Sequence, residues 1–423
     1  LMAQFVGEAL LQVALATLIA VALAEALMKP FDAFIQRDVP LDFIHDPALT
    51  AAVLAVAVVA PVAARALGVA PSAIGYFVAV VYLGSMLGTV TSGGWVARFG
   101  PIRVSQCALA LSCVGLALGA SAWLPLVLAG AVVIGMGYGP ATPASSHILL
   151  RASPPGMVAL TFSIKQTGVP LGGAIAGLAV PAMILALGWR GATLAIGFAC
   201  LAVAFAIEPV RARYDRDLNA RVPISLRSTL APVALVLGTP RLRDMALTSF
   251  VYGGVQITLV SYLVTFLTDS FAMSLVLAGL VMAASQVASV AGRIAWGVVA
   301  DRLLRRRTML GLLGLGMGLS GLATLAAGPS WPAWLLFAYA AAFGATAVGW
   351  NGVYLAEVAH LAPQGQISAA TGGCLFFTFL GVVVAPPLFH LVLDASGSYA
   401  HAYAVFGAAS MAIGARLLLV RPV

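Results

Sequence analysis

Residues 297–307 read Gly-Val-Val-Ala-Asp-Arg-Leu-Leu-Arg-Arg-Arg, and residues 93–100 read Gly-Gly-Trp-Val-Ala-Arg-Phe-Gly. Each stretch ends a long apolar segment, with glycine at its start and arginine a few residues later. The two opening glycines, Gly93 and Gly297, are 204 residues apart, about half of the 423-residue chain. This spacing indicates that the chain contains two copies of one helical unit.

A second pair of matching stretches supports the duplication. Residues 154–156 read Pro-Pro-Gly and residues 363–365 read Pro-Gln-Gly, an offset of 209 residues. Both lie just before an apolar segment. Two similar offsets in the same order favour an internal repeat over coincidence.

The composition excludes an ordinary soluble domain. Hydrophobic residues make up 62% of the chain and charged residues 9%, and the mean hydropathy is +1.04, whereas soluble domains carry about 25% charged residues. Apolar runs of about 20 residues recur along the chain, as in transmembrane helices, and the short alternating segments of an outer-membrane barrel are not seen. We therefore predict an all-α polytopic membrane protein.

Twelve apolar segments are long enough to cross a membrane. They cover residues 48–68, 73–96, 104–122, 124–148, 157–186, 191–209, 245–268, 272–298, 308–327, 331–356, 367–393 and 398–419. A polar stretch divides them six and six. The predicted organisation is thus a six-helix bundle at 47–209, a cytoplasmic linker at 210–244 and a second six-helix bundle at 245–423. Residues 1–46 add an extra apolar helix and a polar stretch, which either crosses the membrane, lies at its surface or has no function.

Arginine is distributed unequally between the connecting segments. If the first predicted span begins in the cytoplasm, nearly all arginines after position 47 fall on that side, and little beyond Arg65 and Arg190 falls outside. Because positive residues stay on the cytoplasmic side, the bias predicts a cytoplasmic C-terminus in a bacterial-type inner membrane. It also explains the net charge of +8 without a nucleic-acid partner.

Twelve spans in two repeats, a basic linker and these loops resemble the major facilitator superfamily over about residues 47–423. The family's loop is approximately Gly-x-x-x-Asp-Arg-x-Gly-Arg-Arg. The second copy matches it through Gly297, Asp301, Arg302, Arg305 and Arg306, with Leu304 at the position of the second glycine. The first copy keeps Gly93, Arg98, Gly100 and Arg103, and has Ala97 at the position of the acid. The resemblance implies two pseudo-symmetric bundles around a central cavity.

In the family, the acid of this loop helps to latch the two bundles together on the cytoplasmic side. An Asp–Arg pair at a helix end gains from weak screening and from the helix dipole, which supports such a role. With Ala97 in the first copy, we expect the latch to depend mainly on Asp301. The alternative is that the arginines only anchor the helices and set the topology.

Ionisable side chains at membrane depth are costly and are candidates for function. Lys165 is about eight residues into the fifth predicted span. An ammonium there needs an aqueous cavity or an anionic partner. We therefore expect Lys165 to bind an anion near the central cavity. The alternative is a structural cation that pairs with a neighbouring helix or extends toward the cytoplasm. The neighbouring Gln166 is expected on a different helix face.

Other polar side chains follow the spans at helical spacing. In the family, spans one, four, seven and ten line the cavity. The candidate substrate-binding residues on spans four, seven and ten are Tyr138, Thr142, Tyr252, Gln256, Trp350 and Asn351, and Lys165 of span five and Gln286 of span eight are added to them. Simple helix packing is the alternative for each. Arg151, Arg293 and Glu357 are candidates for charged contacts between the bundles, and Arg293 for the charge network of the second loop.

These observations favour a secondary or facilitative transporter that moves a small organic anion by alternating access. No acid lies mid-span in spans one, four or seven, so the sequence does not indicate coupling to protons. Whether transport uses another coupling ion or a counter-substrate is left open. An exporter of amphipathic, drug-like compounds is the alternative within this class. A membrane enzyme or sensor is disfavoured, because the four Cys and five His residues are scattered and form no metal or nucleophile–base pattern. We expect no cofactor, no metal and no nucleic acid, and a monomer in the lipid bilayer.

Overall fold

The computed structural model describes residues 74–121, 123–216, 218–219, 226–328 and 331–420, together with residues 63, 67 and 68. The extra helix predicted within residues 1–46 lies outside the described residues, as does nearly all of the first predicted span, 48–68. Within the described part every regular element is helical.

The first half forms helices α3 (Ile74–Phe99), α4 (Pro101–Gly119), α5 (Leu124–Ala152) and α6 (Val158–Ala206). The helical run of α6 is interrupted at Gly188, whose φ of 68° is in the left-handed region. Glycine adopts such a conformation without strain. This interruption falls between the predicted spans 157–186 and 191–209, so α6 corresponds to both.

The second half forms α9 (Pro240–Phe271), α10 (Leu275–Arg302), α11 (Arg306–Ala323), the short η2 (Thr324–Ala326), α12 (Ala333–Ala347), α13 (Asn351–Leu361), α14 (Ile367–Ser396) and α15 (Tyr399–Leu419). Proline near the first position of α4, α5 and α9 suits a helix start, where an N–H has no partner. The predicted span 331–356 proves to be two helices, α12 and α13, with a break at residues 348–350.

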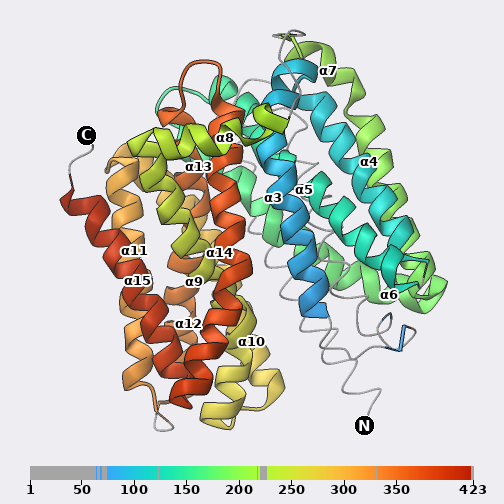
Figure 1. The fold of residues 1–423 in the computed structure, drawn as a ribbon. Coiled ribbons are helices and arrows are strands. Elements are labelled where there is room, and N and C mark those ends of the chain that lie inside the picture. The colour runs from blue at the N-terminus through green and yellow to red at the C-terminus, as the bar shows by residue number, and fades with distance from the viewer. Residues whose placement is uncertain are drawn as a thin grey trace.

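Two helical bundles lie side by side in Figure 1, α3–α6 in blue and green and α9–α15 in yellow to red. One buried hydrophobic cluster lies within the first bundle, and a larger one lies mainly in the second bundle and also includes Leu149, Ala159 and Phe162 of α5 and α6. Ten helical segments of the described residues are long and apolar enough to cross a membrane. The prediction of an all-α polytopic fold is therefore confirmed.

The predicted linker, 210–244, is mostly helical rather than extended. It contains most of α7 (Glu208–Tyr214) and all of α8 (Leu226–Gly238), and α9 already begins at Pro240. Helix α8 crosses the end of the molecule (Figure 1) and packs against α3 of one bundle and α14 of the other. A Cβ at Gly373 of α14 would lie 2.3 Å from the carbonyl oxygen of Pro232 in α8, so the two helices touch through their backbones.

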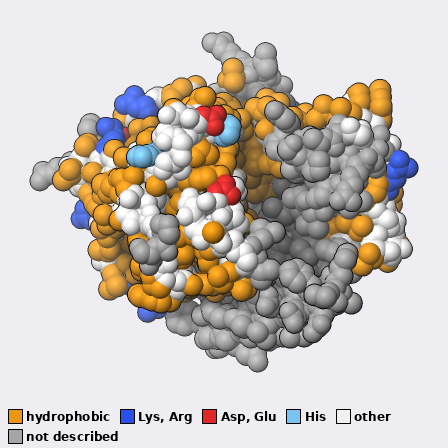
Figure 2. Space-filling model, turned by 90° about the horizontal axis from the view of Figure 1, so that it is seen from below, with side chains coloured by type: hydrophobic (Ala, Val, Ile, Leu, Met, Phe, Trp, Pro, Cys, Tyr) orange, Lys and Arg blue, Asp and Glu red, His pale blue; other side chains and the backbone are white. Residues whose placement is uncertain are grey.

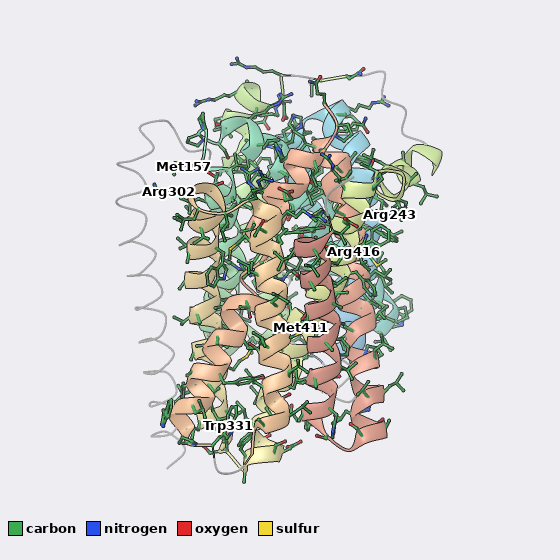
Figure 3. The ribbon with its side chains drawn as sticks, turned by 90° about the vertical axis from the view of Figure 1, so that its left-hand side faces the viewer. Met157, Arg243, Arg302, Trp331, Met411 and Arg416 are labelled. Atoms are coloured by element: carbon green, nitrogen blue, oxygen red, sulfur yellow. The ribbon has the colours of Figure 1, made fainter. Side chains whose placement is uncertain are left out.

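The two ends of the molecule differ in charge. Arg243, Arg302 and Arg416 all lie at the end that carries α8, which we call the charged end, and Trp331 lies at the opposite end (Figure 3). Figure 2 shows that opposite end, where hydrophobic side chains cover most of the described surface and acidic side chains are few. This difference agrees with the arginine bias of the sequence.

The predicted duplication appears in the backbone. Gly156, just before α6, has a φ of 75°, and Gly365, just before α14, has a φ of 74°. Because few other residues adopt positive φ, the two matching sequence stretches build the same turn before equivalent helices.

Candidate functional site

Two glycines of the repeated loop motif lie at helix contacts between the bundles. A Cβ at Gly297 of α10 would lie 2.9 Å from the Cα of Leu160 in α6, and a Cβ at Gly93 of α3 would lie 2.8 Å from the Cα of Ala369 in α14. Leu160 and Ala369 are themselves 209 residues apart, the offset of the repeat. The α6–α10 and α3–α14 interfaces are therefore equivalent contacts, and both depend on glycine for close approach.

Asp301 joins the two bundles at the charged end. Its side chain is 2% exposed, and its two carboxylate oxygens accept hydrogen bonds from the backbone N–H groups of Ala159 (3.0 Å) and Leu160 (2.8 Å) in the first turn of α6. These N–H groups have no partner within their helix, and they form the positive end of its dipole. Arg306 lies 3.5 Å from the same carboxylate.

Figure 3 labels the two neighbours of this contact, Met157 before α6 and Arg302 at the end of α10, close together at the charged end. The acid of the second loop copy thus caps a helix of the other bundle. This is the contact that a latch requires.

The first loop copy makes a different set of contacts. Ala97 has no carboxylate, and its backbone carbonyl accepts a hydrogen bond from the N–H of Asn219 in the linker (2.8 Å). Asp215, also in the linker, accepts from the N–H groups of Ile102 (2.9 Å) and Arg103 (3.1 Å) at the start of α4. Asp215 therefore caps a helix of the bundle that precedes the linker, and no local sequence signal predicted it.

The structure explains why residue 100 of the first copy is glycine. Its φ is 92°, and a Cβ there would lie 2.2 Å from the carboxylate carbon of Asp215. Only glycine leaves room for this cap without strain. Burial raises the pKa of Asp215 above its ordinary value, against the opposing effect of the hydrogen bonds from Ile102 and Arg103.

The arginine of the first copy, Arg103, belongs to a network within the first bundle. Its guanidinium donates to Gln106 (2.9 Å) and lies 3.4 Å from Glu208 in α7. The Gln106 amide donates to the Glu208 carboxylate at 2.7 Å, and the Arg211 guanidinium lies 2.9 Å from the same carboxylate. The hydrogen bond from Gln106 and the charges of Arg103 and Arg211 lower the pKa of Glu208.

The remaining arginines of the motif lie toward the surface. Arg98 stacks on the ring of Phe99, with 5.5 Å between the guanidinium carbon and the ring centroid. Arg302 and Arg305 are exposed. Their anchoring role and their gating role both stay predictions.

Lys165 is 3% exposed, at the contact between α5 and α6. Its ammonium donates to Thr142 Oγ1 (3.3 Å) and to Gln166 Oε1 (3.2 Å). It lies seven residues beyond the first residue of α6, a rise of about 10 Å into the membrane. Gln166 was expected on a different face, but its long side chain reaches back to the Lys165 ammonium.

Arg293 lies in α10, away from the loop charges that it was expected to join. It is 2% exposed, and it donates through Nε to the carbonyl of Val348 (3.0 Å) and through Nη1 to the carbonyl of Gln166 in α6. Because α12 ends at Val348, the carbonyl of Val348 has no partner within the helix and can accept this hydrogen bond. Arg293 therefore bridges the helix break of the second bundle and the first bundle, next to Lys165.

Gln256, Trp350 and Asn351 form a second polar group beside the same helix break. The Gln256 amide oxygen accepts from Trp350 Nε1 (3.1 Å) and from Asn351 Nδ2 (3.0 Å). Tyr252, by contrast, is fully buried within the second bundle, donates to the carbonyl of Leu310 (2.9 Å) and packs edge-on against Trp350. In this structure Tyr252 and Trp350 serve as core residues, and neither side chain is open to a ligand.

The predicted residue Tyr138 lies at the interface between the bundles. Tyr138 of α5 packs against Phe379 of α14, with 6.1 Å between ring centroids, and Tyr82 of α3 packs on the same ring at 5.6 Å. Sequence reasoning missed Phe379, because phenylalanine in an apolar span is indistinguishable from residues that face the lipid or the core. Gln286 is half-buried in α10.

Arg151 is exposed at the end of α5. Glu357 of α13 is half-buried and lines a cavity at the charged end, whose lining residues all belong to residues 241–420 of the second half. The contact between bundles that was expected of Glu357 is therefore not seen among the described residues.

No group of three or more His, Cys, Asp or Glu side chains that could hold a metal ion is found in the described part of the chain. The site comprises two buried cations and the Asp301 cap nearer the charged end. Arg293 lies at the contact between the bundles, and Lys165 lies between α5 and α6 of the first bundle, beside the same Gln166. This site has the polar groups for binding an anion, and no nucleophile beside a base.

The family model of the Major Facilitator Superfamily matches residues 48–386 and again 246–423. Among solved structures, the chain is similar to the E. coli fucose:proton symporter FucP, with 15% identity, a TM-score of 0.65, and coverage of 90% of this chain and 100% of that one. It is similar to the human organic anion transporter MFSD10, with 15% identity, a TM-score of 0.69, and coverage of 89% and 98%.

The proton:xylose symporter XylE is a third similar structure, with 16% identity, a TM-score of 0.68, and coverage of 90% and 95%. Similarity at these identities shows the fold. A comparison with curated proteins finds no significant match.

Proposed function

Because the chain belongs to the major facilitator superfamily, whose members are transporters, we propose that it moves a small organic anion across the membrane by alternating access. The substrate would bind between the two bundles, beside Lys165 and Arg293. A coupling ion or a counter-substrate would supply the driving force, as protons do in the symporters FucP and XylE.

The observation that carries this proposal is the burial of Arg293. Its guanidinium is 2% exposed and contacts two backbone carbonyls, and no carboxylate lies within ion-pair distance of it among the described residues. Removing a cation from water costs several kcal/mol, which two neutral carbonyls offset only in part. A carboxylate or sulfonate of the substrate would supply the missing negative charge.

Lys165 supports the same location. Its ammonium contacts the side chain of Gln166, and Arg293 contacts the backbone carbonyl of the same residue, so both cations border one point of the contact between bundles. Arg293 lies nine residues before the end of α10, about 13 Å of helix. Both therefore lie at a depth where carriers of this plan bind substrates, well inside a hydrocarbon layer of about 30 Å.

The contacts at the charged end support alternating access. The Asp301 cap and the two glycine interfaces hold the bundles together there, so opening toward this end requires that they separate. We propose that the charged end faces the cytoplasm of a bacterial-type cell, on the arginine bias, and that the protein acts as a monomer.

A ligand screen with purified protein tests the proposed substrate class. We expect small carboxylates or sulfonates to raise the thermal unfolding temperature, since a ligand that binds the folded state stabilises it. The same compounds should be taken up or exchanged in proteoliposomes. Lys165→Gln and Arg293→Gln should each abolish the stabilisation.

Arg190→Gln is the matched control. Arg190 is exposed and stacks on Trp189, so this change removes one positive charge far from the proposed site and should preserve the response. Stabilisation by sugars or by cationic drugs alone, or an unchanged response in Lys165→Gln and Arg293→Gln, would contradict an anion site.

A further inference from the structure

A separate cavity of about 520 Å³ opens within the second bundle at the charged end. Its walls come from the start of α9, the end of α10, the start of α11 and the ends of α13 and α15. The residues that line it are Arg241, Ala300, Arg305, Arg306, Arg307, Thr308, Glu357, His360, Leu361, Leu417, Leu418 and Val420. Lys165 and Arg293 are not among them, so the cavity is distinct from the proposed substrate site.

The lining of this cavity is strongly basic, with four arginines against a single glutamate. The acids just outside it are shared among several arginines: Asp244 lies 3.4 Å from Arg307 and 2.8 Å from Arg416, and Asp301 lies 3.5 Å from Arg306. Asp301 already accepts two backbone hydrogen bonds from α6. The local charge is therefore positive even after these pairs are counted.

Donor groups in the lining lack acceptors. The Nε atom of Arg306 is buried and has no hydrogen-bond partner among the described residues. Helix α11 begins at Arg306 with no side-chain cap and no acid in its first turn. The first N–H groups of this helix, which have no partner within it, belong to residues that line the cavity. A buried donor without an acceptor is unfavourable, so a ligand that supplies an acceptor would be bound there.

We propose that this cavity binds a phosphate group. Phosphate offers several acceptor oxygens at once, matches the planar donor set of arginine, and is favoured at a helix start. The phosphate would accept from Arg305, Arg306 and the first turn of α11.

Two sources of phosphate fit the surroundings. Leu417, Leu418 and Val420 line one wall, and the adjoining Leu419 is 82% exposed, which suits the acyl chains of an anionic phospholipid. A water-soluble phosphate ester could enter from the charged end. In either case Arg306 links the cavity to Asp301 and so to the contact between the bundles.

The test measures thermal unfolding of the full chain, purified in detergent without phosphate or added lipid. One series adds inorganic phosphate, with sodium chloride at equal ionic strength as the reference. A parallel series adds phosphatidylglycerol, with phosphatidylcholine as the reference. We expect a saturable rise in the unfolding temperature with phosphate, with phosphatidylglycerol or with both, and the effective series identifies the source.

Variants then locate the binding. Arg305→Gln changes an exposed side chain and should raise the half-saturating concentration by about tenfold or more, as expected for the loss of one charge-assisted contact. Arg306→Gln should do the same. Arg302→Gln, in the same loop but outside the lining, is the matched control and should leave it unchanged.

Lys165→Gln should also leave the phosphate response unchanged, because it changes only the proposed substrate site. If neither series raises the unfolding temperature beyond its reference, or if Arg305→Gln and Arg306→Gln respond like the unmodified protein, the proposal is overturned. Loss of the response in Lys165→Gln alone would likewise overturn it.

Discussion

Replacing Asp301 by Asn should loosen the contact between the two bundles at the charged end. The carboxylate accepts two N–H hydrogen bonds from α6 and is 2% exposed. Asparagine has nearly the same shape but only one acceptor oxygen and no charge. Losing one bond and the charge on the other should cost about 2 kcal/mol, which multiplies the ratio of separated to joined bundles by about 30. A separated state present at about 1% would then rise to roughly a quarter of the molecules.

Distance measurement between two spin labels can detect this shift. Ala152, at the end of α5, and Leu303, just after α10, are both exposed and belong to opposite bundles. Labels at these positions, with Cys107 and Cys113 replaced by alanine, should show a larger long-distance fraction by pulsed electron paramagnetic resonance in Asp301→Asn.

Asp215→Asn is the matched control, because Asp215 caps α4 with the same two-bond geometry inside a single bundle. It should lower the unfolding temperature while leaving the distance distribution as in the unmodified protein. An unchanged distribution in Asp301→Asn would refute the reasoning, since the carboxylate would then not hold the bundles together.

Three further predictions concern the same end of the molecule. Ala97→Asp should cap α14 and so strengthen the α3–α14 contact by about 0.3–2 kcal/mol. Spin labels on the two sides of that interface should then show a smaller long-distance fraction. An unchanged distribution would mean that position 97 does not face the start of α14. Gly297→Ala should cost about 1–3 kcal/mol in thermal stability by overpacking, because its Cβ would lie 2.8 Å from Ser163 Oγ. Gly279→Ala on the same helix, where a Cβ meets nothing within 4 Å, should be neutral or stabilising, and equal losses in both would contradict the close-contact argument. The pKa of Glu208 is lowered in the folded protein, so its ionisation adds stability at pH values above the unfolded pKa of 4.5, and this contribution is lost as the pH falls through the folded pKa. Glu208→Gln should therefore be less stable than the unmodified protein near neutral pH and equal to it in acid, as unfolding curves over about pH 3 to 7 will show. A stability difference that grows in acid would contradict this sign.

The sequence predicted most of the described helices because hydrophobic length is a local property. Where predictions failed, backbone breaks inside apolar runs were the cause. The break at residues 348–350 lies within a continuous apolar segment, and the carbonyl that it frees is satisfied by Arg293 from another helix. A hydropathy pattern contains no record of such a partner. The helices α7 and α8 of the linker region were not predicted, because neither is an apolar span long enough to cross a membrane.

The candidate site shows the same division. Lys165 was identified from its depth in an apolar span, since an ammonium there is costly in any fold. Arg293 was identified as a candidate for a contact between the bundles, but its position along α10 does not tell that its partners there are two backbone carbonyls. Tyr252 and Trp350 fitted a polar stripe on their helices, yet both lie in the core of the second bundle.

The sequence by itself determined that this chain is a membrane-embedded helical protein, that it is duplicated, and that only its second loop copy carries an acid. These are properties of composition and of spacing along the chain. The tertiary structure decided what the acids do. Asp301 of the second bundle caps α6 of the first bundle, whereas Asp215 of the linker caps α4 of the first bundle. The physical reason is that a helix start offers its free N–H groups to any nearby carboxylate, and only packing decides which carboxylate is near.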